Sequence, residues 1–248
     1  ICIPIVLTVV CTKKCHFSSD LFKEVLVPSE YARSLNPHLD SKVVYYGVSR
    51  LPSKKTREEL FSELFPFADP TTTTLISRIG AIEPIKHPVD FIRVAHKLSR
   101  REDLLFVLAG KGDAGYIGYI KSIVGYGGRV VYLGEVSEQD KAEILSHTSV
   151  CLYPTEFEAF GFSLVEPMSH GVPVISYNNT AVKEVLGPGG RTVPTNDLDL
   201  LAAETESMLG DSFDIKELGN IAYRRWNSMF SPQRYAKEVM SVYEKSII

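Results

Sequence analysis

From about residue 70 onward, short apolar runs alternate with segments whose apolar residues recur at helical spacing. The runs are apolar at every position, which is typical of strands that are buried on both faces. The segment that begins at Pro88 predicts a helix, because Phe91, Val94, Ala95 and Leu98 share one face. This alternation predicts an α/β fold with a parallel sheet, helices on both faces and right-handed crossovers. The predicted strands of this part are 74–77, 104–109, 130–133, 150–154 and 173–177.

The rest of the chain also shows alternating strand and helix patterns. A helix is predicted from Thr56, whose hydroxyl fits a capping box with Glu59, and another from Ser137, which fits an N-cap with Asp140 at the third helical position. The last helix is amphipathic and begins at Pro232. The other predicted elements are strands at 3–10, 24–28 and 42–46, and helices from 29, at 115–124, from 163, at 180–186, at 197–209 and at 231–247.

The charge balance narrows the range of partners. The 248 residues include 27 Lys and Arg against 30 Asp and Glu, for a net charge of −3. A chain without a basic excess has no electrostatic basis for binding nucleic acid over a long footprint. The apolar run 1–11 is too short for a membrane span, which needs roughly 20 residues, and its β-branched residues predict a buried strand. Because the chain begins at Ile1 and runs directly into this segment, we expect it either to start inside a longer protein or to be naturally truncated.

Four cysteines are too few for a disulfide framework in a chain of this length. Cys11, Cys15 and His16 lie close together, but a tetrahedral zinc site needs four ligands, and no second Cys/His pair follows at a suitable spacing. Cys151 lies inside an apolar run and is predicted to be part of the core. Reduced thiols and the absence of an export signal in the sequence predict a cytoplasmic protein.

Polar residues collect after the predicted strands, where ligands bind in open parallel sheets. Arg78 and Lys86 flank the loop after the first strand of this part. Two cations beside free helix N-termini suit a diphosphate, because both supply positive potential and hydrogen-bond donors. A glycine-rich loop, Gly110-Lys111-Gly112-Asp113, follows the second strand, and its glycines would let a nucleotide approach the backbone.

The glycine loop leaves a second interpretation open. Residues 110–115 match G-x-G-x-x-G, and Glu135 follows Gly115 by 20 residues, which is the spacing of the ribose-binding acid in dinucleotide-binding proteins. An NAD(P)-dependent oxidoreductase is therefore an alternative. The match lies in the second strand–helix unit of its domain, whereas the fingerprint belongs in the first.

Glu158 and Glu166 are separated by seven residues around a predicted helix start. Ser163 and Glu166 also form an S-x-x-E pattern, so Glu166 could serve only to cap that helix. The capping interpretation does not account for Glu158. Between the two acids, the backbone from Phe160 to Phe162 would present N–H groups at the helix entrance to any bound phosphate.

The stretch 156–176, EFEAFGFSLVEPMSHGVPVIS, resembles the retaining glycosyltransferases of the GT-B fold, specifically the E-x7-E group known as glycosyltransferase family 4. Three more segments resemble motifs of that family in the same order: SRIGAIEPIKHP at 77–88, FVLAGKGD at 106–113 and VVYLGEV at 130–136. The resemblance covers about residues 70–210. It implies transfer of a sugar from a nucleoside-diphosphate sugar to an acceptor hydroxyl, with retention of configuration and without a metal or other cofactor.

The resemblance also implies roles for individual residues. Arg78 and Lys86 would hold the diphosphate and stabilise the departing nucleotide, and Glu158 would bind hydroxyls of the transferred sugar. Glu166 would bind the ribose hydroxyls. The other residues implied at the donor site are Gly110, Lys111, Gly112, Glu135, Val136, Phe160, Gly161, Phe162 and Ser163.

Two departures from the family pattern stand out. His87 follows the lysine where the family often has glycine. The family often has a catalytic histidine after a strand like IPIVLTVV, but here Val10 and Cys11 occupy that place and the nearest histidine is His16. These departures keep open a second interpretation, a non-catalytic subunit that binds nucleotide-sugar or carbohydrate.

The resemblance implies a Rossmann-like donor domain that is complete and an acceptor-side domain that is only partly present. A second chain could complete the acceptor side, and the acceptor would be a sugar or a lipid-linked sugar, which also allows a peripheral position at the membrane. The predicted division has four parts: 1–49 as the end of the acceptor-side domain, 50–73 as a connecting helix and linker, 74–210 as the nucleotide-sugar-binding domain, and 211–248 as C-terminal helices of which the last returns to the acceptor side.

Overall fold

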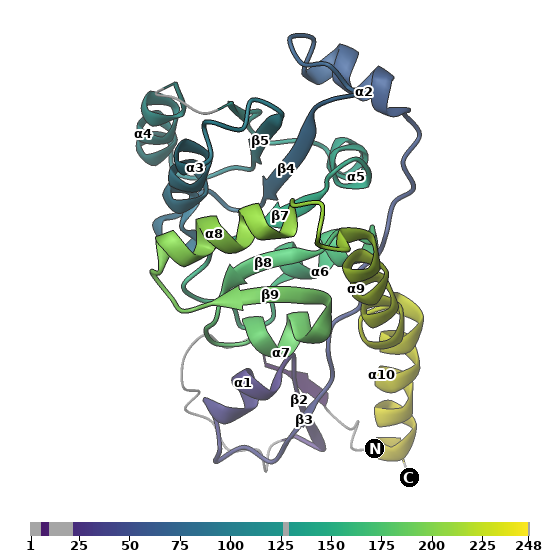
Figure 1. Ribbon diagram of the computed structural model, residues 1–248. Coiled ribbons are helices and arrows are strands. Elements are labelled where there is room, and N and C mark those ends of the chain that lie inside the picture. The colour runs from purple at the N-terminus through teal and green to yellow at the C-terminus, as the bar shows by residue number, and fades with distance from the viewer. Residues whose placement is uncertain (1–5, 10–21, 126–128, 248) are drawn as a thin grey trace.

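The computed structural model describes residues 6–9, 22–125 and 129–247, which contain a large and a small parallel sheet (Figure 1). The strand order of the large sheet is β6-β5-β4-β7-β8-β9. Its first strand in the sequence, β4, pairs with β5 on one side and with β7 on the other, so the direction of winding reverses there. Such a reversal leaves a crevice beyond the carboxyl ends of the strands. The strands are β4 (Thr74–Ile79), β5 (Leu104–Ala109), β6 (Val130–Tyr132), β7 (Val150–Leu152), β8 (Val174–Tyr177) and β9 (Gly190–Val193).

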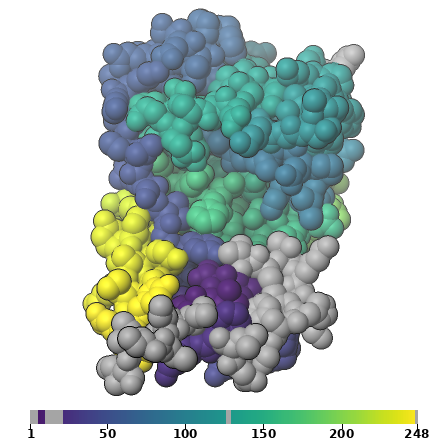
Figure 2. Space-filling view, turned by 180° about the vertical axis from the view of Figure 1, so that it is seen from behind, coloured from purple at the N-terminus to yellow at the C-terminus, as the bar shows by residue number. Residues whose placement is uncertain are grey.

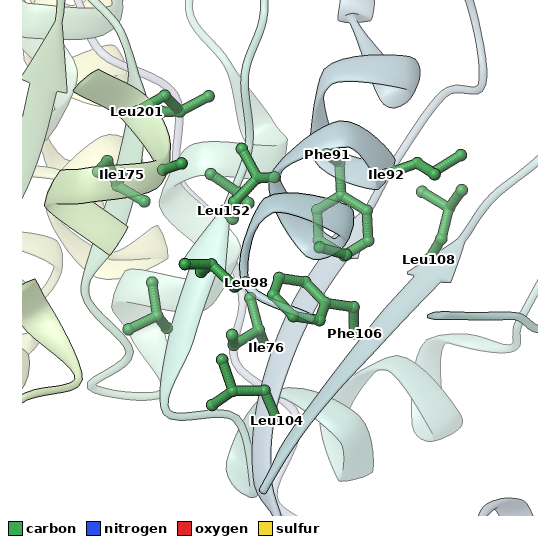
Figure 3. Packing of buried hydrophobic residues seen from close by; sticks show 14 of the residues in the cluster. Ile76, Phe91, Ile92, Leu98, Leu104, Phe106, Leu108, Leu152, Ile175 and Leu201 are labelled. Carbon is green, nitrogen blue, oxygen red and sulfur yellow. The ribbon is translucent and has the colours of Figure 1, made fainter. Parts of the chain in front are cut away.

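Helices cover both faces of the large sheet because its strands are apolar on both sides. One face packs against α3 (Pro88–Lys97), α4 (Ala114–Val124) and α8 (Leu198–Met208). Figure 3 shows Phe91 of α3 against Phe106 of β5, with ring centroids 5.6 Å apart.

The opposite face is covered in two parts. The helices α2 (Arg57–Leu64) and α5 (Glu138–Ser146) pack over β4 and β5. Beside them, α6 (Phe162–Ser169), α7 (Val182–Leu186) and α9 (Ile215–Met229) pack over β7 and β8. Each central strand therefore contributes to two clusters of buried residues, as expected for a parallel sheet between helical layers.

The structure confirms the predicted α/β class with a parallel sheet. It also confirms the capping box of Thr56 and Glu59 and the N-cap at Ser137, whose hydroxyl accepts the N–H of Asp140. No apolar run predicts β9, because its sequence is Gly-Arg-Thr-Val. Pairing with β8 over four positions holds this strand in place, and such a contact leaves no local pattern in the sequence.

The small sheet comes from the front of the chain and has the order β1-β2-β3. Its strands are β1 (Val6–Thr8), β2 (Glu24–Val27) and β3 (Ser41–Val43), with the short helix α1 (Glu30–Ser34) against one side. The C-terminal helix α10 (Pro232–Ile247) lies against the other side, where Val242 packs with Leu26 and Val44. Figure 2 shows α10 beside the N-terminal strands, so the two ends of the described chain meet at this sheet.

Contacts between distant segments fix the small sheet to the large one. Glu184 of α7 accepts the backbone N–H groups of Glu30 and Tyr31 and the hydroxyl of Tyr45. The indole of Trp226 donates to the carbonyl of Val48 at 2.8 Å. These bonds hold the front segment against α7 and α9.

Some sequence predictions fall outside the described residues. They are part of the strand at 3–10, together with Val10, Cys11, Cys15 and His16. Cys151 lies in β7 with 2% of its surface exposed, so its predicted place in the core is confirmed. In the portions of the chain that the structure describes, no helix is long and apolar enough to cross a membrane.

Candidate functional site

Two neighbouring pockets lie at the carboxyl ends of the strands of the large sheet. The first, here called the glycine-loop pocket, has a volume of about 270 Å³ and lies beyond β4, β5 and β6. The second, here called the Glu158 pocket, has a volume of about 200 Å³ and lies beyond β7. Ser163 of α6 lines the first pocket and Phe162 of the same helix lines the second, so the N-terminus of α6 lies between them.

The glycine-loop pocket contains several residues predicted from the sequence. Its lining includes Gly110, Lys111, Glu135, Val136, Ser163 and Glu166. Lys111 and Glu135 form an ion pair of 3.0 Å at the rim, where both side chains are exposed. The lining also includes residues without a prediction from the sequence, namely Ile79, Gly80, Ala81, Glu138 and Lys141.

The glycines of this region allow two loops to approach each other closely. At Gly110, φ is +141° and a Cβ atom would lie only 1.8 Å from the carbonyl oxygen of Gly80. At Gly112, a Cβ atom would lie 2.1 Å from the carbonyl oxygen of Ile82. The glycine pattern therefore has a structural cause in the contact between the loops after β4 and β5. A nucleotide is not needed to explain it.

Arg78 lies inside β4 and is fully buried, whereas the sequence predicts it just after the strand. Its Nη2 donates to the carbonyl oxygens of Ala81 at 3.1 Å and Lys86 at 2.7 Å, which supports the loop at the pocket. Its guanidinium carbon lies 4.6 Å from the centre of the Tyr153 ring. Its Nε and Nη1 are buried and have no hydrogen-bond partner within the described residues.

The guanidinium of Arg78 is a buried cation that forms no ion pair with a carboxylate among the described residues. Burial lowers the pKa of Arg78, but a guanidinium remains protonated in proteins. Burying a charge with unused donors is costly unless a counter-ion or hydrogen-bond acceptor compensates. The local chemistry therefore favours an anionic ligand near the loop after β4.

Lys86 and Glu158 meet in the Glu158 pocket, although 71 residues separate them in the sequence. Lys86 Nζ donates to Glu158 Oε1 at 2.7 Å and to the carbonyl oxygen of Phe157 at 2.6 Å. Both side chains are mostly buried, with 18% and 11% of their surfaces exposed. The backbone N–H of Glu158 donates to Thr180 Oγ1 at 2.9 Å, so the loop after β8 holds the loop that carries Glu158.

The helix α6 begins differently from the sequence prediction. Its N-cap is Gly161, with φ +94° and no side-chain capping bond, and Ser163 is already the second helical residue. The interpretation of Glu166 as a capping-box partner of Ser163 is therefore wrong. Without a side-chain cap, the first N–H groups of the helix remain available at the boundary between the two pockets.

The two aromatic residues that flank Gly161 differ in burial. Phe160 is buried in the core, whereas Phe162 keeps 48% of its surface exposed. The ring of Tyr46, from the front of the chain, stacks on Phe162 with a centroid distance of 5.4 Å. Pro28 and Tyr46 also line the Glu158 pocket, so the front segment forms part of its wall.

Glu166 has a cationic partner that the sequence analysis does not identify. Lys141 of α5 donates to Glu166 Oε1 at 2.7 Å and pairs with Glu138 at 2.9 Å. Burial raises the pKa of Glu166, and Lys141 opposes that effect. The spacing of Glu138 and Lys141 on one helix is a weak signal for a pair, but nothing in the sequence connects Lys141 to Glu166, 25 residues away.

His87, where the sequence departs from the family pattern, adopts φ +44°. This left-handed conformation is the one that glycine adopts most easily. Contacts of the ring with two carboxylates hold the residue, since Nδ1 lies 2.9 Å from Asp90 Oδ2 and Nε2 lies 3.4 Å from Glu156 Oε2. The turn therefore keeps a backbone suited to glycine despite the substitution.

Among the residues described, no group of three or more His, Cys, Asp or Glu side chains is arranged to hold a metal ion. The dinucleotide alternative is not favoured by the positions of its residues. The glycine loop follows β5 rather than β4, the first strand of the sheet in sequence order. Glu135, its proposed ribose-binding acid, is exposed and paired with Lys111.

Comparison with known proteins places the chain in a family. Residues 62–225 match the family described as Glycosyl transferases group 1. The chain is 33% identical over 115 residues to the MMP alpha-(1->4)-mannosyltransferase of Mycolicibacterium hassiacum, covering 45% of this chain and 28% of that protein. It is 26% identical over 214 residues to the O-antigen chain mannosyltransferase B of Escherichia coli, covering 80% of this chain and 55% of that protein.

Solved structures show the same fold. A glycosyltransferase from Rickettsia africae aligns with a TM-score of 0.82 at 18% identity, covering 98% of this chain and 70% of that chain. Anabaena Alr3699/HepE in complex with UDP and glucose aligns with a TM-score of 0.76 at 16% identity, covering 90% of this chain and 64% of that chain. The chain spans about a quarter to a half of the length of the two curated relatives named above. It belongs to the glycosyl transferases group 1 family, and its Rossmann-like parallel-sheet domain matches structures of the GT-B fold.

Proposed function

We propose that the chain supplies the donor site of a retaining, metal-independent glycosyltransferase of the E-x7-E group. In this proposal, a hexose passes from a nucleoside diphosphate to an acceptor hydroxyl. The bond between the anomeric carbon and the diphosphate oxygen breaks, and its electron pair leaves with the phosphate. The acceptor oxygen forms the new glycosidic bond and passes its proton to the departing diphosphate.

The observation that carries the proposal is the buried, unpaired guanidinium of Arg78 beneath the loop that joins the two pockets. Its side chain lines neither pocket, but its uncompensated positive charge favours a diphosphate that lies between a nucleoside and a sugar. Stabilising the negative charge that develops on a departing nucleotide is electrostatic catalysis, and fixed donors in a buried site make it efficient. Arg78 would act in this way together with Lys86 and the N-terminus of α6.

The arrangement of the two pockets supports one orientation of the donor, with its nucleoside in the first pocket and its sugar in the second. The nucleoside would occupy the glycine-loop pocket, whose lining includes Glu135, Val136 and Glu166. The diphosphate would cross the N-terminus of α6, whose first N–H groups have no side-chain cap. The sugar would enter the Glu158 pocket, where the Glu158 carboxylate can accept hydrogen bonds from its hydroxyls.

The acceptor would approach from the front segment. Pro28 and Tyr46 already form one wall of the Glu158 pocket, which leaves the anomeric carbon facing that side. We propose a sugar or lipid-linked sugar as acceptor, a cytoplasmic or membrane-peripheral location, and further acceptor-side structure contributed by more of this protein or by a second chain. The mannosyltransferase names among the relatives and the UDP complexes among the similar folds support UDP- and GDP-sugars as the first donors to test.

A calorimetric titration with UDP-glucose, GDP-mannose and ADP-glucose tests the donor site. We expect one of them to bind, and Arg78→Met to weaken that binding about 30- to 160-fold, as expected for loss of about 2–3 kcal/mol of electrostatic stabilisation. Arg100→Met is a matched control, since Arg100 is exposed. Because Arg78 is buried, Lys86→Gln serves as a second variant, and thermal melting checks that each variant is folded. The donor-site proposal is wrong if none of the three nucleotide-sugars binds.

Transfer and hydrolysis assays decide between catalysis and binding alone. We expect the protein that binds a donor to release its nucleotide slowly in water, and to do so equally well with and without EDTA. Glu158→Gln should lower the rate more than the donor affinity. Donor binding without any hydrolysis or transfer would instead identify a non-catalytic binding subunit, and titration with NADH and NADPH covers the oxidoreductase alternative.

A further inference from the structure

Lys141 forms a wall of the glycine-loop pocket without being part of any recognised motif. It is the fourth residue of α5 and lines the pocket together with Gly110 and Lys111 of the glycine loop. Only 16% of its side chain is exposed. A long cationic side chain buried to this degree needs carboxylate partners, and Lys141 has two, Glu166 and Glu138.

Lys141 forms a hydrogen bond with only one of the two carboxylate oxygens of Glu166. Lys141 Nζ donates to Oε1 at 2.7 Å, whereas Oε2 has no hydrogen-bond partner in the described part of the chain. Glu166 itself lines the pocket. A carboxylate with one oxygen held and the other unused is oriented to accept a hydrogen bond from a ligand hydroxyl through the unused oxygen.

The geometry points to Lys141 as the positioning residue for Glu166: it fixes the carboxylate so that the unused oxygen accepts a ribose hydroxyl of the donor nucleotide. This inference rests on the proposed donor site and adds to it a residue and a selectivity. The pair should distinguish ribonucleotides from their deoxy counterparts, because only the former supply the hydroxyl that Glu166 accepts. A buried acceptor that loses its donor is costly, so the discrimination should be large.

The groups around Glu166 leave Lys141 as its main compensating charge. His170, from the end of α6, lines a small cavity together with Lys141 and Glu166. Burial, followed by the nearby cations Arg50 and Lys141, lowers the pKa of His170 to about 4. Cys151 of β7 has a pKa raised to about 12 by burial. Both are therefore neutral near pH 7. Glu138 adds negative charge, and the exposed Lys111–Glu135 pair contributes no net charge.

This arrangement predicts how donor binding depends on pH. Burial raises the pKa of Glu166, and Lys141 lowers it. Since the carboxylate form is present only above the pKa, removing Lys141 should move the acidic limit of nucleotide binding to higher pH. A purely structural role for Lys141 would lower the stability of the fold without moving that limit.

The test compares the affinities of UDP and GDP with those of 2′-deoxy-UDP, 3′-deoxy-UDP and the corresponding guanosine analogues. We expect the wild type to bind the better ribonucleotide at least about tenfold more tightly than one of its deoxy forms. Lys141→Met should weaken ribonucleotide binding about tenfold, leave binding of that deoxy form within about twofold, and shift the acidic limit upward. Lys141→Arg should restore both properties. Lys216→Met, at an exposed position of α9, is the matched control.

A double-variant cycle strengthens the assignment. If the two residues act as one unit, Lys141→Met combined with Glu166→Gln should bind no more weakly than the weaker of the two single variants. The inference is overturned if Lys141→Met keeps the wild-type ribose discrimination and pH limit while the wild type binds UDP or GDP. Failure of the wild type to bind either nucleotide would instead refute the donor site itself, so the two failures are distinguishable.

Discussion

Three glycine-to-alanine substitutions separate the two reasons for which glycine is needed around the glycine-loop pocket. Gly118 lies inside α4, where an added Cβ atom meets nothing within 4 Å. Gly134 also has open space, but its φ is +77°. Gly110 combines φ +141° with a Cβ position 1.8 Å from the backbone oxygen of Gly80. Alanine at Gly134 therefore adds an unfavourable backbone conformation, and alanine at Gly110 adds both such a conformation and a steric clash.

The expected magnitudes follow from these geometries. Gly118→Ala should stabilise the protein by up to about 1 kcal/mol, because alanine favours the helix interior. Gly134→Ala should destabilise it by about 1–2 kcal/mol through the left-handed backbone alone. Gly110→Ala should cost at least about 3 kcal/mol. This variant has a similar backbone strain, and its methyl group must also displace Gly80, whose N–H donates to the carbonyl of Ala109. The displacement would also weaken the hydrogen bond from the N–H of residue 110 to the carbonyl of Gly134.

Urea unfolding measures the series. A shift of the midpoint at constant slope reports a change in free energy of unfolding, and thermal melting should follow with about 2–4 °C for each kcal/mol. Nucleotide affinity measured on folded Gly110→Ala should also fall, since Gly110 lines the pocket. The reasoning is refuted if Gly110→Ala is no less stable than Gly134→Ala, because the close approach of the two loops would then carry no energetic weight.

The remaining predictions concern three other residues. Replacing Glu184 with alanine removes the acceptor for two N–H groups of α1 and the Tyr45 hydroxyl, so hydrogen exchange should accelerate at least tenfold in α1 but stay unchanged in β4. Burial alone would raise the pKa of Glu143, but bonds from Ser53 and the backbone of Lys54 and Lys55 hold it at about 2. That stabilisation is present above the ordinary pKa of 4.5 and is lost as pH falls towards 2. Between pH 5 and pH 2 the wild type should therefore lose free energy of unfolding faster than Glu143→Gln, and parallel curves would contradict the assignment. His87→Gly should be more stable than His87→Val by about 1–2 kcal/mol in thermal melts, because both lose the ring contacts but only valine keeps the strain; equal stability would exclude backbone strain at this turn.

Local patterns in the sequence suffice for much of the large sheet. Its central strands are apolar at every position and its helices carry capping residues, and both signals act over only a few residues. Because the strands can be located from these local signals, the order of the motifs along the chain places Arg78, Lys86, Glu158 and Glu166 near the strand ends. The strand β9 lacks such a signal, because only its pairing with β8 makes it a strand.

The state of each site residue depends on contacts that the sequence does not reveal. Burial leaves two nitrogens of Arg78 unpaired, and the loop after β7 brings Glu158 within 2.7 Å of Lys86. The helix α5 brings Lys141 to Glu166, and this ion pair accounts for the position of the Glu166 carboxylate. The helix start at Gly161 shows that Glu166 is not the capping partner of Ser163. The sequence alone therefore determined the α/β class, the family resemblance and the approximate place of the site, because these follow from local periodicity and motif order. Only the tertiary structure decided which charges are paired, because ion pairs and burial join residues that are distant in the chain.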